Sequence, residues 1–309
     1  MKKAFLFMAA ALTLAAFSCK KPANGTDEQN PGAQVTVAAE NLVAYFPLET
    51  AEKEVSVGEG ITFDSKKGAG DFGDGRIGKA YTNTKKMNIE EAYLKFNLAK
   101  NNAFTKLESM TFSAWLYVPT PLANPSNPSE KLTAKGAILS FNGTGVEPVW
   151  PSFVYLLDNE GVNEETGKAW MQFNGRVDFL SVEGKPLMWP NASDEAYAAK
   201  DKWIHVARTY DATTGAWVTY ANGLKTFEGL FTPKNDGKDP VGAINAAFAS
   251  DCNALYLGGW ASRIEGKASD TWLNYFCGSI DEVRFYNKAL SETEMLELYK
   301  QELKVALGK

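Results

Sequence analysis

Hydrophobic and polar residues alternate along most of the chain beyond residue 40, with the period expected of strands that bury one face. The alternation is clearest in AYLKFNL (92–98) and MTFSAWLYV (110–118), where every second residue is Ala, Leu, Phe, Met or Val. The same pattern predicts further strands at 42–48, 136–141, 152–158, 169–174, 176–182, 203–211, 217–222, 224–230, 254–259 and 278–287.

Turn signals separate these strands, and a helical period is confined to the C-terminus. Asn-Gly at 174–175 and at 222–223 is the dipeptide preferred in two-residue β-hairpins. Ser291 and Glu294 have the spacing of a capping box, and an apolar stripe follows over 295–299. The pattern therefore predicts an all-β protein, a sandwich of two antiparallel sheets with a short C-terminal helix.

The first 18 residues have the composition of an export signal. The basic start MKK precedes an apolar run of fourteen residues, 4–17, which is too short to span a bilayer and is typical of a signal peptide. Cys19 follows Ser18 directly and resembles the lipidated cysteine of a bacterial lipoprotein, although Phe17 and Ala16 depart from the usual residues. The alternative is an ordinary secretory signal with an incidental cysteine.

Residues 20–40 are polar and contain Pro and Gly, as a flexible tether does. We expect a signal peptide at 1–18, a lipidated cysteine and tether at 19–40, and one domain at 41–309. The protein would then be exported and anchored through its lipid to the bacterial cell envelope, at the outer membrane, on a face that the sequence does not define.

Composition narrows the classes of partner. The net charge is −5 over 309 residues, which gives no electrostatic reason to expect nucleic acid. Aromatic residues make up 12% of the chain, which suits a β protein or a sugar-binding one.

Cys252 and Cys277 could form a disulfide in an oxidising compartment, and two buried thiols are the alternative. A zinc site is not expected, because the chain has one histidine and no CxxC motif.

Several motifs carry a family resemblance through their order along the chain. The most specific are WIHVARTYD (203–211) and GSIDEVRFYNKALS (278–291), and the others are LVAYFPLE (42–49), DSKKG (64–68), GRIGKAY (75–81), MTFSAWLYV (110–118), YANG (220–223) and LYLGG (255–259). Together they resemble the laminin G-like domain of bacterial proteins, within the concanavalin A-like lectin/glucanase superfamily, over about 41–300.

The resemblance implies a jelly roll of two curved antiparallel sheets. This chain departs from the pattern through long inserts at 119–134, 158–168, 184–201 and 232–250. The inserts lengthen loops, which usually determine the partner, so the resemblance does not define a ligand.

His205, the only histidine, invites a catalytic interpretation that its neighbours do not support. On a strand its side chain shares a face with Trp203 and Ala207, and Asp211 lies six residues away, about 20 Å along the strand. No G-x-S-x-G motif and no E-x-D-x-x-E run, which the superfamily's β-glucanases carry, is present. We therefore expect a structural histidine and no enzymatic activity, with a glycoside hydrolase using dispersed carboxylates as an alternative.

Asp281 is the carboxylate that the resemblance singles out. Strand parity places it on the face of Val283 and Phe285, at the edge of the core, where a carboxylate needs a partner. Related jelly rolls hold a structural calcium ion on such an aspartate and on main-chain carbonyls, which here would come from Phe46 to Leu48 and from near Gly78. The alternative is a hydrogen-bonded aspartate that holds the N-terminal strand.

Tryptophans in loop-like contexts are the candidate ligand contacts, because an exposed indole stacks well on the C–H face of a sugar. The candidates, with two polar companions, are Trp150, Trp189, Trp260, Trp272, Arg263 and Asp270. The alternative is that these tryptophans fill the bases of loops. We expect a lipid-anchored, non-catalytic module that binds carbohydrate, with a protein-binding adhesin or assembly module as the alternative.

Overall fold

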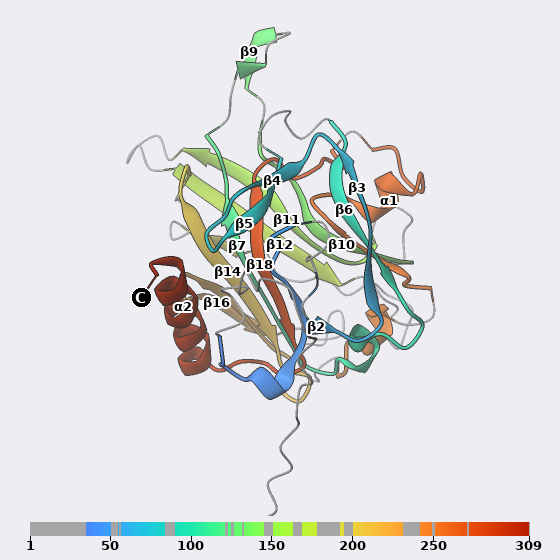
Figure 1. Ribbon diagram of the computed structural model, residues 1–309, viewed down its shortest axis with the longest axis vertical. Coiled ribbons are helices and arrows are strands. Elements are labelled where there is room, and N and C mark those ends of the chain that lie inside the picture. The colour runs from blue at the N-terminus through green and yellow to red at the C-terminus, as the bar shows by residue number, and fades with distance from the viewer. Residues whose placement is uncertain are drawn as a thin grey trace, which may run out of the picture.

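Strands dominate the structure, which forms two antiparallel sheets packed face to face (Figure 1). The computed structural model describes residues 35–50, 55, 57–83, 90–120, 123–124, 127–131, 133–144, 151–162, 169–177, 192–194, 200–230, 242–248, 251–270 and 272–308. Cys19, Trp150 and Trp189 lie outside the described residues, as do the signal segment and most of the tether.

The first sheet has nine strands. They are β1 (Leu42–Phe46), β2 (Val57–Gly58), β4 (Asp71–Asp74), β5 (Lys79–Thr82), β7 (Met110–Tyr117), β14 (Trp203–Tyr210), β15 (Ala216–Ala221), β16 (Leu224–Leu230) and β18 (Ser279–Tyr286). The order is β16-β15-β14-β7-β18-β1-β2, with β5 also on β18 and β4 on β5. Both strongest sequence motifs therefore lie at the centre of this sheet, on β14 and β18.

The second sheet has seven strands. They are β3 (Ile61–Gly68), β6 (Ala92–Leu98), β10 (Gly136–Thr144), β11 (Pro151–Val162), β12 (Ala169–Val177), β13 (Ala192–Asp194) and β17 (Ala254–Leu257), in the order β13-β12-β11-β10-β17-β6-β3. The short strands β8 (Ala123–Asn124) and β9 (Asn127–Lys131) pair with each other in the 119–134 insert. The described chain is thus a β-sandwich, as the alternation predicted.

The core between the sheets is rich in aromatic side chains. Phe104, on the short 3-10 helix η3 (Ala103–Lys106), meets Phe141 and Phe285 edge to face, with ring centroids 4.8 and 5.0 Å apart. All three are fully buried, and they join strands of both sheets. Such pairs prefer edge-to-face geometry because the ring edge is positive and the face negative.

A separate helical element covers the outer face of each sheet. The long helix α2 (Glu292–Ala306) packs Met295 and Leu298 against Ala207 and Tyr286 of the nine-stranded sheet. The one-turn helix α1 (Ala261–Ile264) belongs to the segment between β17 and β18, which covers the seven-stranded sheet. In Figure 1 the two helices lie on opposite sides of the sandwich. None of the described helices is long and apolar enough to cross a membrane.

Ser291 and Glu294 form the expected capping box at the start of α2. The Asn222-Gly223 hairpin is also confirmed, with φ of 51° and 77° at the two turn residues. The hairpin expected at 174–176 is wrong, because β12 continues through these residues and pairs with β11 as far as Val177.

The folded part of the chain begins before residue 41. Val37 is buried against α2, and the backbone N–H of Thr36 donates to Gln301 Oε1 at 2.9 Å. Residues 35–40, which composition assigned to the tether, therefore pack on the C-terminal helix.

Candidate functional site

A β-bulge in β18 places charged side chains beneath α2. Asp281 is aligned with Trp115 and Arg284 with Ser113, so one extra residue is inserted between them, and Glu282 has a φ of 52°. The bulge shifts strand parity by one residue. Asp281 therefore shares the side of Trp115, and the expectation that it shares a face with Val283 and Phe285 is wrong.

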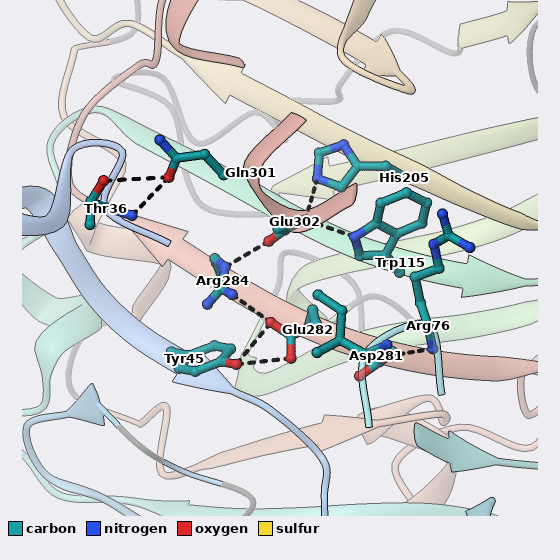
Figure 2. Close-up of polar contacts among 11 residues, drawn as sticks. Thr36, Tyr45, Arg76, Trp115, His205, Asp281, Glu282, Arg284, Gln301 and Glu302 are labelled. Atoms are coloured by element: carbon teal, nitrogen blue, oxygen red, sulfur yellow. Dashed lines mark hydrogen bonds and ion pairs between the residues drawn. The ribbon is translucent and has the colours of Figure 1, made fainter. Parts of the chain in front are cut away.

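Glu302 of α2 is the centre of a buried polar network (Figure 2). Its Oε1 accepts a hydrogen bond from Arg284 Nε, and its Oε2 accepts one from Trp115 Nε1, each at 2.7 Å. Arg284 also pairs with Glu282, which accepts a further hydrogen bond from the Tyr45 hydroxyl. Burial raises the pKa of Glu282 above its usual range, while Arg284 opposes this rise.

His205 lies at the margin of this network and has no exposed surface. Its Nε2 is 3.4 Å from Glu302 Oε2, and its ring meets that of Trp115 edge to face. Burial lowers the pKa of His205 below its ordinary value, although the Glu302 carboxylate opposes the shift, so the imidazole is neutral near pH 7. A ring sealed beneath α2 reaches no substrate, as expected for a structural histidine.

Asp281 uses one carboxylate oxygen to hold a turn. Its Oδ2 accepts the backbone N–H groups of Arg76 and Ile77 at 2.7 and 2.9 Å, whereas Oδ1 is buried and has no hydrogen-bond partner. Burial is the main cause of a raised pKa for Asp281, and Glu282 adds to it. These hydrogen bonds tie Asp281 to the turn at 75–78 rather than to the N-terminal strand.

The Glu49 carboxylate lies against the same turn. A Cβ at Gly78 would be 2.3 Å from Glu49 Oε1, and Glu49 Oε2 accepts the backbone N–H of Lys79 at 2.9 Å. Within the described residues, no cluster of three His, Cys, Asp or Glu side chains has the geometry of a metal site. A calcium ion here would need main-chain oxygens as well as carboxylates.

Cys252 and Cys277 are both buried, and the structure contains no disulfide between them. The disulfide expected from the oxidising compartment is thus absent, and the alternative of two buried thiols describes these residues. Burial raises the pKa of Cys252 to about 12, so this thiol is protonated.

Trp272 and Trp260 form a pair near α1 in which only one ring is exposed. Trp260 is 1% exposed and packs with Leu273 on the outer face of the seven-stranded sheet, so it cannot present a face to a ligand. Trp272 is 47% exposed, and its ring meets Trp260 edge to face with centroids 5.4 Å apart. Of these two candidates, the alternative of filling a loop base describes Trp260, whereas ligand contact by the exposed Trp272 stays a prediction.

Arg263 of α1 contacts two residues that follow Trp272. Its Nη1 donates to the carbonyl oxygen of Leu273 at 2.6 Å, and its guanidinium lies 5.2 Å from the Tyr275 ring centroid. Asp270 is exposed, and its carbonyl accepts the backbone N–H of Leu273. The segment 260–275 thus combines an exposed indole, a guanidinium and a carboxylate.

Comparison with solved structures finds β-sandwich folds similar to this chain. The binding domain of botulinum neurotoxin DC in complex with SialylT has a TM-score of 0.53 at 10% identity, over 86% of this chain and 52% of that one. The same domain in complex with rat synaptotagmin II gives 0.52 at 10% identity, over 85% and 52%. The chain therefore spans about half the length of these neurotoxin chains, and the likeness shows the fold.

Domain 4 of a GH43 arabinanase from Geobacillus stearothermophilus, in complex with arabinotriose, matches at 20% identity with a TM-score of 0.44, over 84% of this chain and 98% of that one. No protein-family model matches the chain, and no curated protein matches it in sequence.

Proposed function

We propose that the protein is a non-catalytic carbohydrate-binding module of the laminin G-like kind, and that Trp272 is its main ligand contact. The supporting observation is the half-exposed Trp272 indole, which the buried ring of Trp260 holds in place. A ring fixed before binding loses little conformational freedom when a sugar stacks on it. Arg263 and Asp270 offer a donor and an acceptor for hydroxyl groups at its margin.

The test is glycan binding by the purified domain and by a Trp272→Ala variant. Binding on a glycan array or in affinity gels should fall at least about tenfold in the variant, the effect of losing roughly 1.4 kcal/mol of stacking. Leu230→Ala is the matched control, because Leu230 is 64% exposed on β16 of the other sheet. Flat results across plant, host and microbial glycans would refute the proposal.

A protein partner is the second candidate. An exposed tryptophan also serves as an anchor in protein interfaces. Among the structural neighbours, the binding domain of botulinum neurotoxin DC is in complex with SialylT in one structure and with rat synaptotagmin II in another. A pull-down that recovers a protein, with no competition by sugar and with loss on Trp272→Ala, would favour this candidate over the first.

We also propose that Asp281 and Glu49 hold a structural calcium ion, together with main-chain carbonyls of Phe46 and Gly78. The buried, unpartnered Oδ1 of Asp281 supports this, because a cation would satisfy it. The ion would tie β18 to the turn at 75–78 and supply no chemistry. Calcium should raise the melting temperature of the wild type but not of Asp281→Asn, and an unchanged wild type in excess EGTA and in calcium would contradict the site.

The anchoring proposal rests on Cys19, which would carry the lipid that holds the domain at the cell envelope. In the native host the full-length chain should fractionate with membranes, and a Cys19→Ala variant should be released to the soluble fraction. Equal partitioning of the two proteins would leave an ordinary secretory signal as the explanation.

A further inference from the structure

The guanidinium of Arg263 is held in a fixed plane by two residues that follow the exposed Trp272. Its hydrogen bond to the Leu273 carbonyl and its stacking on Tyr275 restrain it from two directions. Leu273 directly follows Trp272, so the carbonyl oxygen that holds the guanidinium belongs to the residue after the exposed tryptophan. A planar donor that is oriented before binding loses less entropy than a flexible one.

Most of the hydrogen-bonding capacity of Arg263 is unused. A guanidinium has five N–H donors, and the structure records one hydrogen bond, to Leu273. The side chain is partly exposed, and its remaining donors have no described hydrogen-bond partner.

No carboxylate neutralises this cation within the described chain. Glu265 follows two residues later, but its Oε1 accepts from Tyr256 and Asn142, and its Oε2 pairs with Lys267 at 3.1 Å. Arg263 forms no salt bridge with any described acidic residue, although the protein as a whole has a net charge of −5. The positive charge is therefore available for a partner outside the chain.

We infer that the ligand of this site is an acidic glycan, whose ring carboxylate pairs with Arg263 while a neighbouring sugar face stacks on Trp272. The inference rests on the proposed carbohydrate-binding function and specifies its ligand class. A carboxylate fits the two parallel donors of a guanidinium, and such charge-assisted pairs are about twice as strong as neutral hydrogen bonds. Uronic and sialic acids are the sugars that carry this group.

The test compares acidic oligosaccharides with neutral counterparts by calorimetry. The pairs are trigalacturonate with galactotriose, and 3′-sialyllactose with lactose, which also distinguish a uronic from a sialic acid. We expect one acidic member to bind about tenfold or more tightly than its neutral partner. Arg263→Gln should remove this preference by weakening the acidic member more than its neutral partner, whereas Trp272→Ala should weaken both.

Two controls keep the outcome interpretable. Lys100→Gln removes an exposed positive charge just after the end of β6, whereas Tyr93 lies near the start of that strand. This variant should leave the preference for the acidic ligand intact. Arg263→Lys retains the charge without the paired donors and should keep only part of the preference, which should weaken with added salt. Equal melting temperatures for wild type and variants show that the fold is preserved.

The possible failures are distinguishable. Suppose that acidic and neutral members of both pairs bind equally and that Trp272→Ala loses this binding. The inference of an acidic ligand is then overturned, and the glycan-binding function is retained. If neither pair binds and the protein captures poly-glutamate through Arg263, both the acidic glycan and the glycan-binding function are overturned. The ligand is then an acidic peptide. An unchanged acidic preference in Arg263→Gln overturns the assignment of the residue.

Discussion

Replacing Glu302 with Gln tests whether α2 is held by its buried charge or only by its apolar face. The Glu302 carboxylate has no exposed surface and accepts from Arg284 and Trp115, both at 2.7 Å. Gln has nearly the same shape but only one acceptor oxygen. Whichever donor faces the new amide N–H₂ group loses its acceptor, and the charge of Arg284 is then opposed only by Glu282.

The expected loss is about 3 kcal/mol in the free energy of unfolding. Removing one partner of a buried ion pair costs roughly 3–5 kcal/mol, because the other charge is left uncompensated. The lower end applies here, since Arg284 keeps its pair with Glu282. Met295 and Leu298 keep their apolar contacts, so the helix should remain docked under native conditions.

Urea unfolding followed by tryptophan fluorescence measures this difference, with far-ultraviolet circular dichroism as the second probe. Glu297→Gln is the matched control, because it makes the same chemical change at an exposed position of the same helix and should stay within about 0.5 kcal/mol of wild type. A loss below about 1 kcal/mol in Glu302→Gln, with unchanged slopes, would refute the reasoning. The apolar face of α2 would then be sufficient.

Two further predictions concern the same helix and the histidine beneath it. Because burial lowers the folded-state pKa of His205, the unfolded chain binds more protons, so the unfolding free energy should fall as pH drops below about 6.5, by up to ~1.4 kcal/mol per pH unit from this group. The slope between pH 7.5 and 5.5 should be shallower in His205→Gln, and equal slopes in urea titrations would contradict this. Ser291→Ala removes the capping box and should cost about 1 kcal/mol by the same assay, whereas Glu297→Gln should not.

The regular strands could be predicted from sequence because their burial follows strict alternation. The run 92–98 is β6 without any shift, and 110–118 differs from β7 by one residue. Alternation does not predict burial correctly where a bulge interrupts the regular strand. The bulge at Glu282 inserts one residue into β18, and a side chain that is exchanged between faces in this way leaves no mark in the hydrophobic pattern.

Glu302 was missed although the sequence contains a signal for it. It lies seven residues after Met295 and four after Leu298, so it occupies the apolar stripe of the predicted helix. A carboxylate on that stripe requires a buried cationic or N–H partner. The identity of the partners could not be predicted, because Trp115 lies 187 residues away in sequence and the side of β18 on which Arg284 lies depends on the bulge.

Trp260 and Trp272 show a different limit. Both follow short polar or glycine-containing segments, and their local sequences give equal reason to expect exposure. Which ring is buried depends on the segment between β17 and β18 lying over the seven-stranded sheet, where Leu273 and Trp260 occupy the same apolar cluster. This packing is a tertiary property, which local sequence does not encode.

The arrangement of the two covered faces explains why the strongest sequence motifs and the candidate ligand site are separate. The motifs on β14 and β18 supply His205 and Arg284 to the outer face of the nine-stranded sheet, and α2 seals that face with the Glu302 network. Residues committed to such a seal cannot also meet a ligand without undocking the helix. On the opposite sheet the covering segment contains only a one-turn helix, so it can bury Trp260 and still leave Trp272 exposed. The proposed ligand site therefore lies in the loop segment between β17 and β18, while the motifs that carry the family resemblance hold the C-terminal helix in place.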